Sequence, residues 1–381
     1  MMNFEFDRPV DRRETGSLKW DKYAGRDVIP LWVADMDFRS PPSVIEALHR
    51  HVEHGVFGYT LPPKELPETI ISRLFNTYGW KIDPDWIIWL PGLVTGLNVT
   101  CRAVGGDHDD VMTAAPVYPP FLTAPGHSPR NLVPVALGKK DNRWTFDLEG
   151  MEKAVTSRTG LFILCNPHNP VGRIYTREEL ESLATFCERH DIIICSDEIH
   201  CDLLLDEDKP HIPMASLGPD IARRTITLMA PSKTYNLPGF GCSLAVIPEN
   251  GLRKRFLQAM AGIVPHVNAL GYTAALAAYR DQGQWLKELL KYLRGNRDLV
   301  EDAVANMPGL SMPHVEATYL AWIETGARGP KDPAAFFEEA GVGLWNGKDF
   351  GGSAAARLNF ACHRDLLKKA LDRMARALER H

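Results

Sequence analysis

The 381-residue sequence has no long apolar run and nowhere approaches the roughly 18 consecutive apolar residues that a membrane-spanning helix needs. The first 13 residues are too polar for a secretory signal peptide. The seven cysteines are odd in number and contain no C-x-x-C pair, a pattern typical of reduced thiols. We therefore expect a cytoplasmic protein without a membrane partner.

Positive charge is not in excess either. The chain has 43 Lys and Arg against 48 Asp and Glu, a formal net charge of −5. A protein that follows a nucleic-acid backbone usually needs a basic surface, so we expect no nucleic-acid partner. The histidines at 49, 51 and 54 lack the nearby cysteines or carboxylates that would complete a metal site, and we predict no metal.

No repeat, low-complexity tract or Gly/Ser-rich linker divides the chain, so its organisation must be inferred from the order of predicted elements. Helical patterns separate several short apolar runs, and one helix starts at a capping box formed by Thr176 and Glu179. Alternating strands and helices predict an α/β fold with a mostly parallel sheet covered on both faces. The predicted strands are Trp86–Leu90, Val111–Ala114, Leu161–Cys165, Ile192–Cys195, Thr225–Met229 and Ser243–Ile247.

After Asn250 the pattern becomes mainly helical, with helices expected over 252–260, 269–279 and 285–306. Short strand-like runs return at 318–323 and 357–360, before a closing amphipathic helix over 364–378. This order predicts a second, smaller α+β domain. We expect a large domain over residues 46–285 and a small domain built from residues 1–45 and 286–381.

Polar side chains with useful chemistry follow the ends of the predicted strands. In open α/β sheets ligands bind outside the carboxyl ends of the strands, so these residues are candidates for one site. They are Val94 and Thr95 at a helix start, Tyr118, Asn169, Asp197, and Ser232 with Lys233.

This set suits a flat, anionic, electron-withdrawing aldehyde cofactor. The helix start near Thr95 offers free N–H groups and a positive dipole end to a phosphate. Tyr118 can stack on a planar ring, and Asp197 can pair with a protonated ring nitrogen, while Asn169 can donate to a ring oxygen. Lys233 can form a Schiff base and, once released, act as a general base.

Each residue also has a simpler interpretation. Lys233 can be a solvated loop cation, Asp197 can cap the following helix, and Tyr118 can simply pack beside its two prolines. The cofactor hypothesis rests on their joint occurrence at successive strand ends. Cys165 and Cys195 are poor nucleophile candidates because both lie in strands predicted to be buried, which raises the pKa of a thiol.

Four motifs resemble one enzyme family over nearly the whole chain. They are Asn-Pro-His-Asn-Pro-Val-Gly-Arg at 166–173, Ser-Asp-Glu-Ile-His at 196–200, Ser-Lys-Thr-Tyr-Asn-Leu-Pro-Gly at 232–239 and Leu-Trp-Val-Ala-Asp-Met-Asp-Phe at 31–38. The sequence resembles the fold type I pyridoxal-phosphate (PLP) enzymes, specifically the MalY/PatB-type cystathionine β-lyases related to class I and II aminotransferases. The resemblance implies a fold type I transferase structure, a seven-stranded and mostly parallel sheet, and PLP as cofactor.

The resemblance also implies roles for individual residues. Lys233, Tyr118 and Asp197 are the implied catalytic residues, and Arg357, Tyr59 and Ala34 the implied substrate-binding residues. Tyr59 resembles a tyrosine that reaches the neighbouring subunit's cofactor phosphate, which implies a homodimer with shared sites. The implied cofactor-binding residues are Val94, Thr95, Tyr118, Asn169, Asp197, His200, Ser232, Lys233 and Tyr59.

Two positions depart from the aminotransferase pattern. Gly241 stands where many aminotransferases carry a phosphate-binding arginine, which leaves more of the phosphate contact to the helix start, Ser232 and Tyr59. His200 stands where they commonly carry a tyrosine near the ring oxygen. A helix-capping or packing role for His200 is the alternative.

The resemblance implies an amino-acid substrate and an α,β-elimination of cystathionine or another cysteine S-conjugate to a thiol, pyruvate and ammonia. One alternative is a PLP-dependent aminotransferase, which would use the same residues. A second alternative is a regulatory or binding protein that retains the fold.

Overall fold

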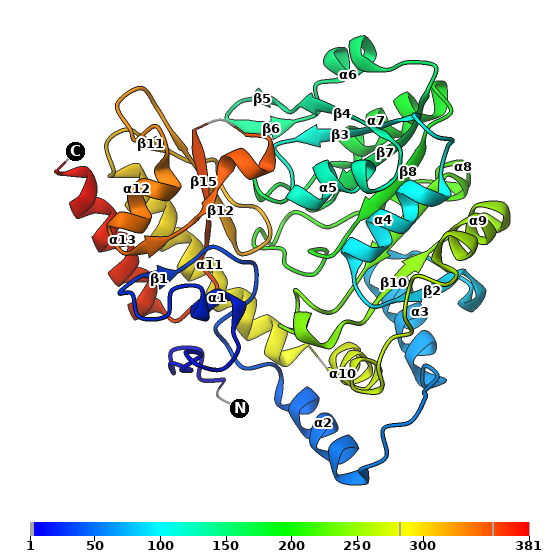
Figure 1. Ribbon diagram of the computed structural model, residues 1–381, viewed down its shortest axis with the longest axis horizontal. Helices are drawn as coiled ribbons and strands as arrows, with labels where there is room; N and C mark the ends of the chain where they lie inside the picture. Colours follow the sequence, from blue (N-terminus) through cyan, green and yellow to red (C-terminus); the bar gives the residue numbers. More distant parts are fainter. Residues whose placement is uncertain (1–3, 282, 353, 381) are drawn as a thin grey trace.

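The centre of the molecule is a seven-stranded sheet, seen nearly edge-on among the cyan and green elements of Figure 1. This computed structural model describes residues 4–281, 283–352 and 354–380. The sheet has the order β2–β10–β9–β8–β7–β3–β4, and β10 runs antiparallel to both of its neighbours. The pairs β9–β8, β8–β7, β7–β3 and β3–β4 are parallel, which confirms the predicted mostly parallel sheet.

Six of the seven strands match the predicted runs within two residues at each end. The seventh, β4, was missed because it lies at the edge of the sheet, is largely exposed and contains Pro134, so its sequence lacks the apolar pattern of a central strand. The strands are β2 (Ile87–Leu90), β3 (Asp110–Ala115), β4 (Asn131–Ala136), β7 (Thr159–Cys165), β8 (Ile193–Asp197), β9 (Thr225–Met229) and β10 (Ser243–Val246).

Both faces of this sheet are covered. Successive side chains of β7 point to opposite faces, so Leu161 and Ile163 join one apolar core while Phe162 and Leu164 join another. The first core contains α4 (Leu93–Ala103) and α9 (Asn250–Met260), and the second contains α7 (Arg177–Arg189). Thr176 and Glu179 form the predicted capping box at the start of α7.

A second, four-stranded antiparallel sheet lies beside the large one, in the orange and red region of Figure 1. Its order is β11–β12–β15–β14, with β11 (Leu310–Ser311), β12 (Leu320–Thr325), β14 (Trp345–Asn346) and β15 (Ala355–Asn359). The helices α11 (Gln284–Ala305) and α13 (Arg364–Leu378) contribute to the apolar core beneath it.

The N-terminal segment belongs with this second region. The strand β1 (Ile29–Pro30) pairs in parallel with β13 (Val342–Gly343), and Figure 1 shows the blue N-terminal segment beside the orange and red elements. The predicted domain boundaries at 45/46 and 285/286 fall within α2 (Pro42–His54) and α11, and the division itself stays a prediction.

Within the described part of the chain, no helix has the length and apolar character needed to cross a membrane. The remaining elements are α1 (Leu18–Asp21), α3 (Glu65–Tyr78), α5 (Pro119–Thr123), β5 (Gly138–Lys140), β6 (Arg143–Thr145), α6 (Leu148–Ala154), α8 (Pro219–Arg223), α10 (Ala269–Tyr279) and α12 (Pro333–Glu339).

Candidate active site

The carboxyl ends of three adjacent parallel strands supply three of the candidate residues. Asp197 is the last residue of β8, Asn169 lies in the loop after β7, and Lys233 lies in the loop after β9. The register pairs Cys165 with Asp197 and Asp197 with Leu228, so the three strands end side by side. The order of the strands, rather than closeness along the chain, therefore brings these side chains to one edge of the sheet.

Lys233 points its amine at the backbone of the N-terminal segment. Its Nζ donates a hydrogen bond of 2.6 Å to the carbonyl oxygen of Ala34. Burial, together with the charge of Arg357, lowers the pKa of the Lys233 amine to about 8, against the opposing effects of Asp35 and Asp197. An amine with this pKa is partly neutral just above pH 7 and can act there as a nucleophile or a base.

Asp197 is a buried carboxyl, 5% exposed, and forms no ion pair with any of the described residues. Its Oδ1 accepts a hydrogen bond of 3.1 Å from the Ile199 amide. Burial raises the pKa of Asp197 to about 7, against the opposing effects of that hydrogen bond and of Lys233. A cation placed beside this carboxyl would restore its charged form, as the protonated nitrogen of a cofactor ring would.

Arg357 is fully buried on β15 and faces the end of the large sheet. Its Nη1 donates to Asn169 Oδ1 at 3.0 Å, and its Nη2 donates to the Trp32 carbonyl at 2.8 Å. The guanidinium carbon lies 4.6 Å from the ring centre of Trp345 and 4.9 Å from that of Phe350. Burial lowers the pKa of Arg357 to about 10, so the side chain stays charged at neutral pH.

Two buried nitrogen atoms at this site are unpartnered. Arg357 Nε and His200 Nδ1 have no hydrogen-bond partner among the described residues. Burial, with Lys233 and Arg357 nearby, holds the pKa of His200 well below its ordinary value, so the ring is neutral. Unpaired buried polar atoms are costly in a folded protein and commonly mark the place of a ligand. His200 is thus available to a ring oxygen and Arg357 to a carboxylate.

Tyr118, the predicted ring-stacking residue, lies at the start of α5. Its backbone N–H donates to the Asn169 carbonyl at 3.1 Å, and its ring meets the ring of Trp345 edge to face, with centroids 6.3 Å apart. Burial raises the pKa of the Tyr118 hydroxyl above its ordinary value. Tyr118 therefore packs against Trp345, in line with its alternative interpretation as a packing residue. It also lies beside Asn169 at the candidate site.

Two of the predicted phosphate-binding residues, Val94 and Thr95, lie at the start of α4. Val94 and Thr95 lie in the first turn of this helix, after Gly92, so the helix begins two residues earlier than predicted. Its first N–H groups have no helical carbonyl to bond, which leaves them for an anion. Ser232 immediately precedes Lys233 in the loop after β9.

The structure gives a physical reason for Gly241. Its φ of +58° lies in the left-handed region, and a Cβ added there would lie 2.9 Å from the carbonyl oxygen of Pro91. Any larger residue would be strained by its backbone conformation and would also meet Pro91. This backbone therefore does not admit the arginine that many aminotransferases carry at this position.

Tyr59 is not brought to the site within one chain. It lies between α2 and α3, and its side chain is fully exposed. Figure 1 shows that the connection from α2 to α3 runs along the outer edge of the molecule. The predicted role of Tyr59 therefore requires a second chain.

The backbone of residues 32–36 contributes more hydrogen bonds to the candidate site than the sequence analysis predicted. The carbonyls of Trp32 and Ala34 accept from Arg357 and Lys233, and the Asn359 amide donates to the neighbouring carbonyls of Val33 and Asp35. Sequence reasoning named only Ala34 from this segment. It missed the others because backbone carbonyls carry no residue-type signal, although the family-specific motif at 31–38 marked the segment.

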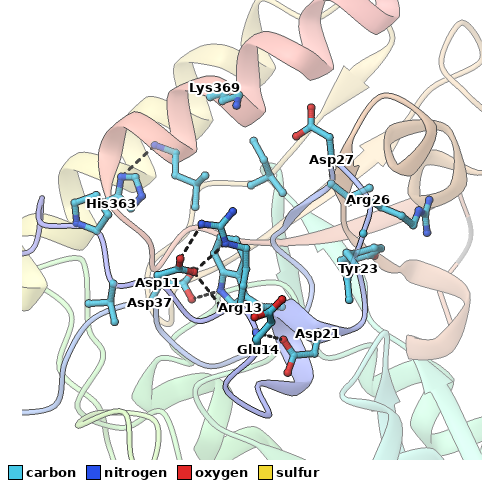
Figure 2. A pocket seen from close by; sticks show the side chains of 18 residues that line it. Asp11, Arg13, Glu14, Asp21, Tyr23, Arg26, Asp27, Asp37, His363 and Lys369 are labelled. Atoms are coloured by element: carbon cyan, nitrogen blue, oxygen red, sulfur yellow. Dashed lines mark hydrogen bonds and ion pairs between the residues drawn. The ribbon is translucent and has the colours of Figure 1, made fainter.

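A separate cavity of about 710 Å³ lies between the N-terminal segment and α13 (Figure 2). Figure 2 shows Asp11 hydrogen-bonded to Arg13 in this cavity, with Asp37 beside them. Neither Lys233 nor Arg357 lines it. The cavity is therefore distinct from the site at the end of the large sheet.

These residues fit the cofactor that the motifs imply. PLP is a planar aldehyde with a protonable ring nitrogen, a ring hydroxyl and a phosphate. The buried carboxyl of Asp197 and the unpartnered Nδ1 of His200 offer complementary groups to the ring, and the start of α4 offers N–H groups to the phosphate. Lys233 supplies an amine for the aldehyde.

With one antiparallel strand in an otherwise parallel seven-stranded sheet, and a smaller sheet formed largely by the C-terminal part, the protein has the aminotransferase-like fold type I architecture. The family described as aminotransferase class I and II matches residues 26–374, and the chain belongs to this family.

The chain is also similar to individual known proteins over nearly its whole length. Cystathionine beta-lyase PatB of Bacillus subtilis (strain 168) is 37% identical, over 98% of this chain and 99% of its own length. Among solved structures, OvoB has a TM-score of 0.96 at 49% identity, covering 98% of this chain and 99% of its own. Cystalysin from Treponema denticola, whose structure contains pyridoxal 5'-phosphate, has a TM-score of 0.94 at 33% identity, with 100% of both chains covered.

Proposed function

We propose that this protein is a PLP-dependent carbon–sulfur β-lyase that cleaves cystathionine or another cysteine S-conjugate to a thiol, pyruvate and ammonia. The observation that carries the proposal is the convergence of Lys233, Asp197 and Arg357 at one edge of the large sheet, two of them buried. The similarity to a relative named cystathionine beta-lyase, over nearly the full length of both chains, supports this reaction.

The cofactor supplies one part of the chemistry: bound PLP withdraws electrons from the substrate Cα and makes its hydrogen acidic. Asp197, held at the end of β8, keeps the ring nitrogen protonated. Lys233, with its Nζ at the end of the large sheet, would hold the cofactor through the aldehyde, and its free amine would serve as the base of the reaction. Because its pKa is lowered to about 8, the free amine can take the Cα proton near neutral pH.

Arg357 fixes the substrate. Its fully buried guanidinium, with Nε unpartnered among the described residues, binds the α-carboxylate and orients the Cα–H bond toward Lys233. The bond between Cβ and sulfur then breaks, and the sulfur leaves with the electron pair as a thiolate. The rings of Trp345 and Phe350 hold the guanidinium in place and limit water access to it.

The experiment is an assay of the purified protein with cystathionine and a panel of cysteine S-conjugates. We expect equal amounts of pyruvate and free thiol, and no product from Lys233→Ala. If neither product accumulates while a keto acid supports amino exchange, the protein is an aminotransferase. That second candidate function is favoured by the family to which the chain belongs.

We also propose a homodimer in which Tyr59 reaches the neighbouring site. Large apolar side chains are exposed at the end of α2 and along the connection to α3, and Tyr59 is one of them. Isolated apolar residues are common on surfaces, but several exposed within one short stretch of chain are typical of an interface. They are Val52, Val56, Phe57, Tyr59 and Leu61.

Finally, we propose a cytoplasmic location. All seven cysteines are free and buried, as expected for a protein that folds in a reducing compartment. Burial raises the pKa of the Cys165 and Cys195 thiols, so neither is an activated nucleophile.

A further inference from the structure

The amine of Lys233 shares its hydrogen-bond acceptor with a buried tyrosine. Ala34 O accepts from Lys233 Nζ at 2.6 Å and from the Tyr319 hydroxyl at 3.1 Å. Ala34 is 6% exposed and Tyr319 is 1% exposed, so both hydrogen bonds lie away from bulk solvent. A carbonyl that receives two donors in a poorly solvated site is a strong local acceptor for an ammonium group.

The next residue, Asp35, is a carboxylate held in a fixed place. Arg12 Nη2 donates to its Oδ2 at 2.7 Å, and Asn359 Nδ2 donates to its backbone carbonyl at 2.7 Å. Its Oδ1 is buried and has no hydrogen-bond partner among the described residues. Lys19 Nζ lies 3.9 Å from that oxygen, beyond hydrogen-bond reach. Asp35 therefore has one carboxylate oxygen that no hydrogen bond from the described residues satisfies.

A neighbouring carboxylate in the same cluster differs from Asp35. Asp37 accepts from Lys19 Nζ at 2.8 Å, from Arg12 Nη1 at 2.8 Å and from the Trp20 indole at 2.9 Å, so its charge is balanced locally. The groups that shift the pKa of Lys233 are Asp35, Asp197 and Arg357, and Asp37 is not one of them. Asp35 and Asp37 thus form a natural pair for comparison.

Resting on the proposed function, we propose that Asp35 is a positioning residue that stabilises the protonated Lys233 amine while that amine is held at the Ala34 carbonyl. Lys233 gains a positive charge when it takes the Cα proton, in a site where the buried guanidinium of Arg357 repels that charge. Asp197 is committed to the cofactor ring. Asp35 supplies the compensating negative charge, which attracts the protonated amine across space. Its side chain also anchors the segment that holds the Ala34 carbonyl in place.

The proposal depends on the charge of each titratable group near Lys233. Asp35 and Asp197 raise the pKa of Lys233, while burial and Arg357 lower it. His200 is held neutral by its burial. Tyr319 has a pKa raised by burial and by Asp35, and it stays neutral as well. Of the two carboxylates that raise the pKa of Lys233, Asp35 is therefore the one that is not proposed to contact the cofactor.

The test uses the full chain prepared without cofactor, so that Lys233 is a free amine. The rate at which an acid anhydride acylates Lys233 is measured by mass spectrometry from pH 6 to 10, which gives the titration midpoint of the amine. Asp35→Asn is expected to lower this midpoint, so that acylation at pH 7 becomes several-fold faster. Asp35→Glu is expected to restore most of the wild-type midpoint.

Two further variants separate charge from structural damage. Arg12→Gln removes a cation that compensates Asp35, so it is expected to move the midpoint upward, opposite to Asp35→Asn. Asp37→Asn removes a carboxylate from the same cluster and is expected to leave the midpoint within about 0.2 units of wild type, a shift of less than twofold in neutral amine. Circular dichroism checks the fold of each variant.

The proposal fails if Asp35→Asn leaves the midpoint unchanged, or if Asp37→Asn lowers it as much. Should Asp35→Asn not fold, Arg12→Gln decides the matter, because an unchanged or lowered midpoint contradicts the proposal. The readout needs neither PLP nor turnover. A protein that lacks lyase activity would refute the proposed function and still report the effect of Asp35 on Lys233.

Discussion

Arg357 donates a hydrogen bond of 3.0 Å from Nη1 to Oδ1 of Asn169, and this contact joins the small sheet to the large one. Arg357 lies on β15 and Asn169 in the loop after β7, so the predicted carboxylate-binding and ring-oxygen-binding residues are positioned by each other. Substrate and cofactor positions are therefore coupled through one side-chain pair.

Arg357→Lys should weaken substrate binding because a lysine cannot bond Asn169, the Trp32 carbonyl and a carboxylate at once with fixed geometry. We expect kcat/KM for cystathionine to fall about 10- to 100-fold, chiefly through KM. Steady-state kinetics measures the change. The PLP absorbance band should be retained, and an unchanged KM would contradict the assigned role.

Asp197→Asn should stabilise the cofactor-free protein at pH 8 while weakening PLP binding. The pKa of Asp197 is raised to about 7, so the folded state binds more protons than the unfolded state between about pH 4 and 7. The stability that depends on the protonated carboxyl is full below pH 4 and is lost as the pH rises through 7. We expect a gain of about 1–4 kcal/mol in the free energy of unfolding at pH 8.

Urea unfolding of wild type and Asp197→Asn at pH 4 and pH 8 measures this effect. The two proteins should differ little at pH 4, where the carboxyl is protonated in the folded state. A gain of equal size at both pH values would instead indicate a packing effect, and no gain at pH 8 would show that the carboxyl is not under electrostatic strain.

Mixing two inactive variants should restore activity if Tyr59 acts in the neighbouring site. A hybrid of Lys233→Ala and Tyr59→Phe subunits has one site that carries both changes and one site that carries neither. Random pairing makes half of the dimers hybrid, so recovery to about a quarter of the wild-type activity is expected. Each variant alone is the control, and activity no greater than their average would place Tyr59 in its own chain's site.

Gly241→Ala should destabilise the protein by about 1–3 kcal/mol, because the left-handed backbone and the close approach of Pro91 both oppose a side chain. The matched control is Gly239→Ala, where an added Cβ meets no atom within 4 Å and the backbone is not left-handed. Thermal unfolding compares the two. Equal melting temperatures would show that this backbone shifts at little cost.

Much of the fold could be predicted because periodicity is a local property. The runs at 225–229, 269–279 and 364–378 match β9, α10 and α13 to the residue, since each is long or strongly patterned. The exposed edge strand β4 was missed because edge strands need no apolar pattern. The start of α4 was placed two residues late because Gly92 gives a weaker capping signal than a polar side chain.

The sequence by itself determined the order of the elements and the residue types at the strand ends, including Lys233, Asp197 and Asn169, because both follow from local pattern and motif. Only the tertiary structure decided what surrounds them. The Ala34 carbonyl lies 199 residues before Lys233 in the chain and is brought to it by folding. The charge on Lys233 depends on burial and on distances to Asp35 and Arg357, which no linear pattern specifies.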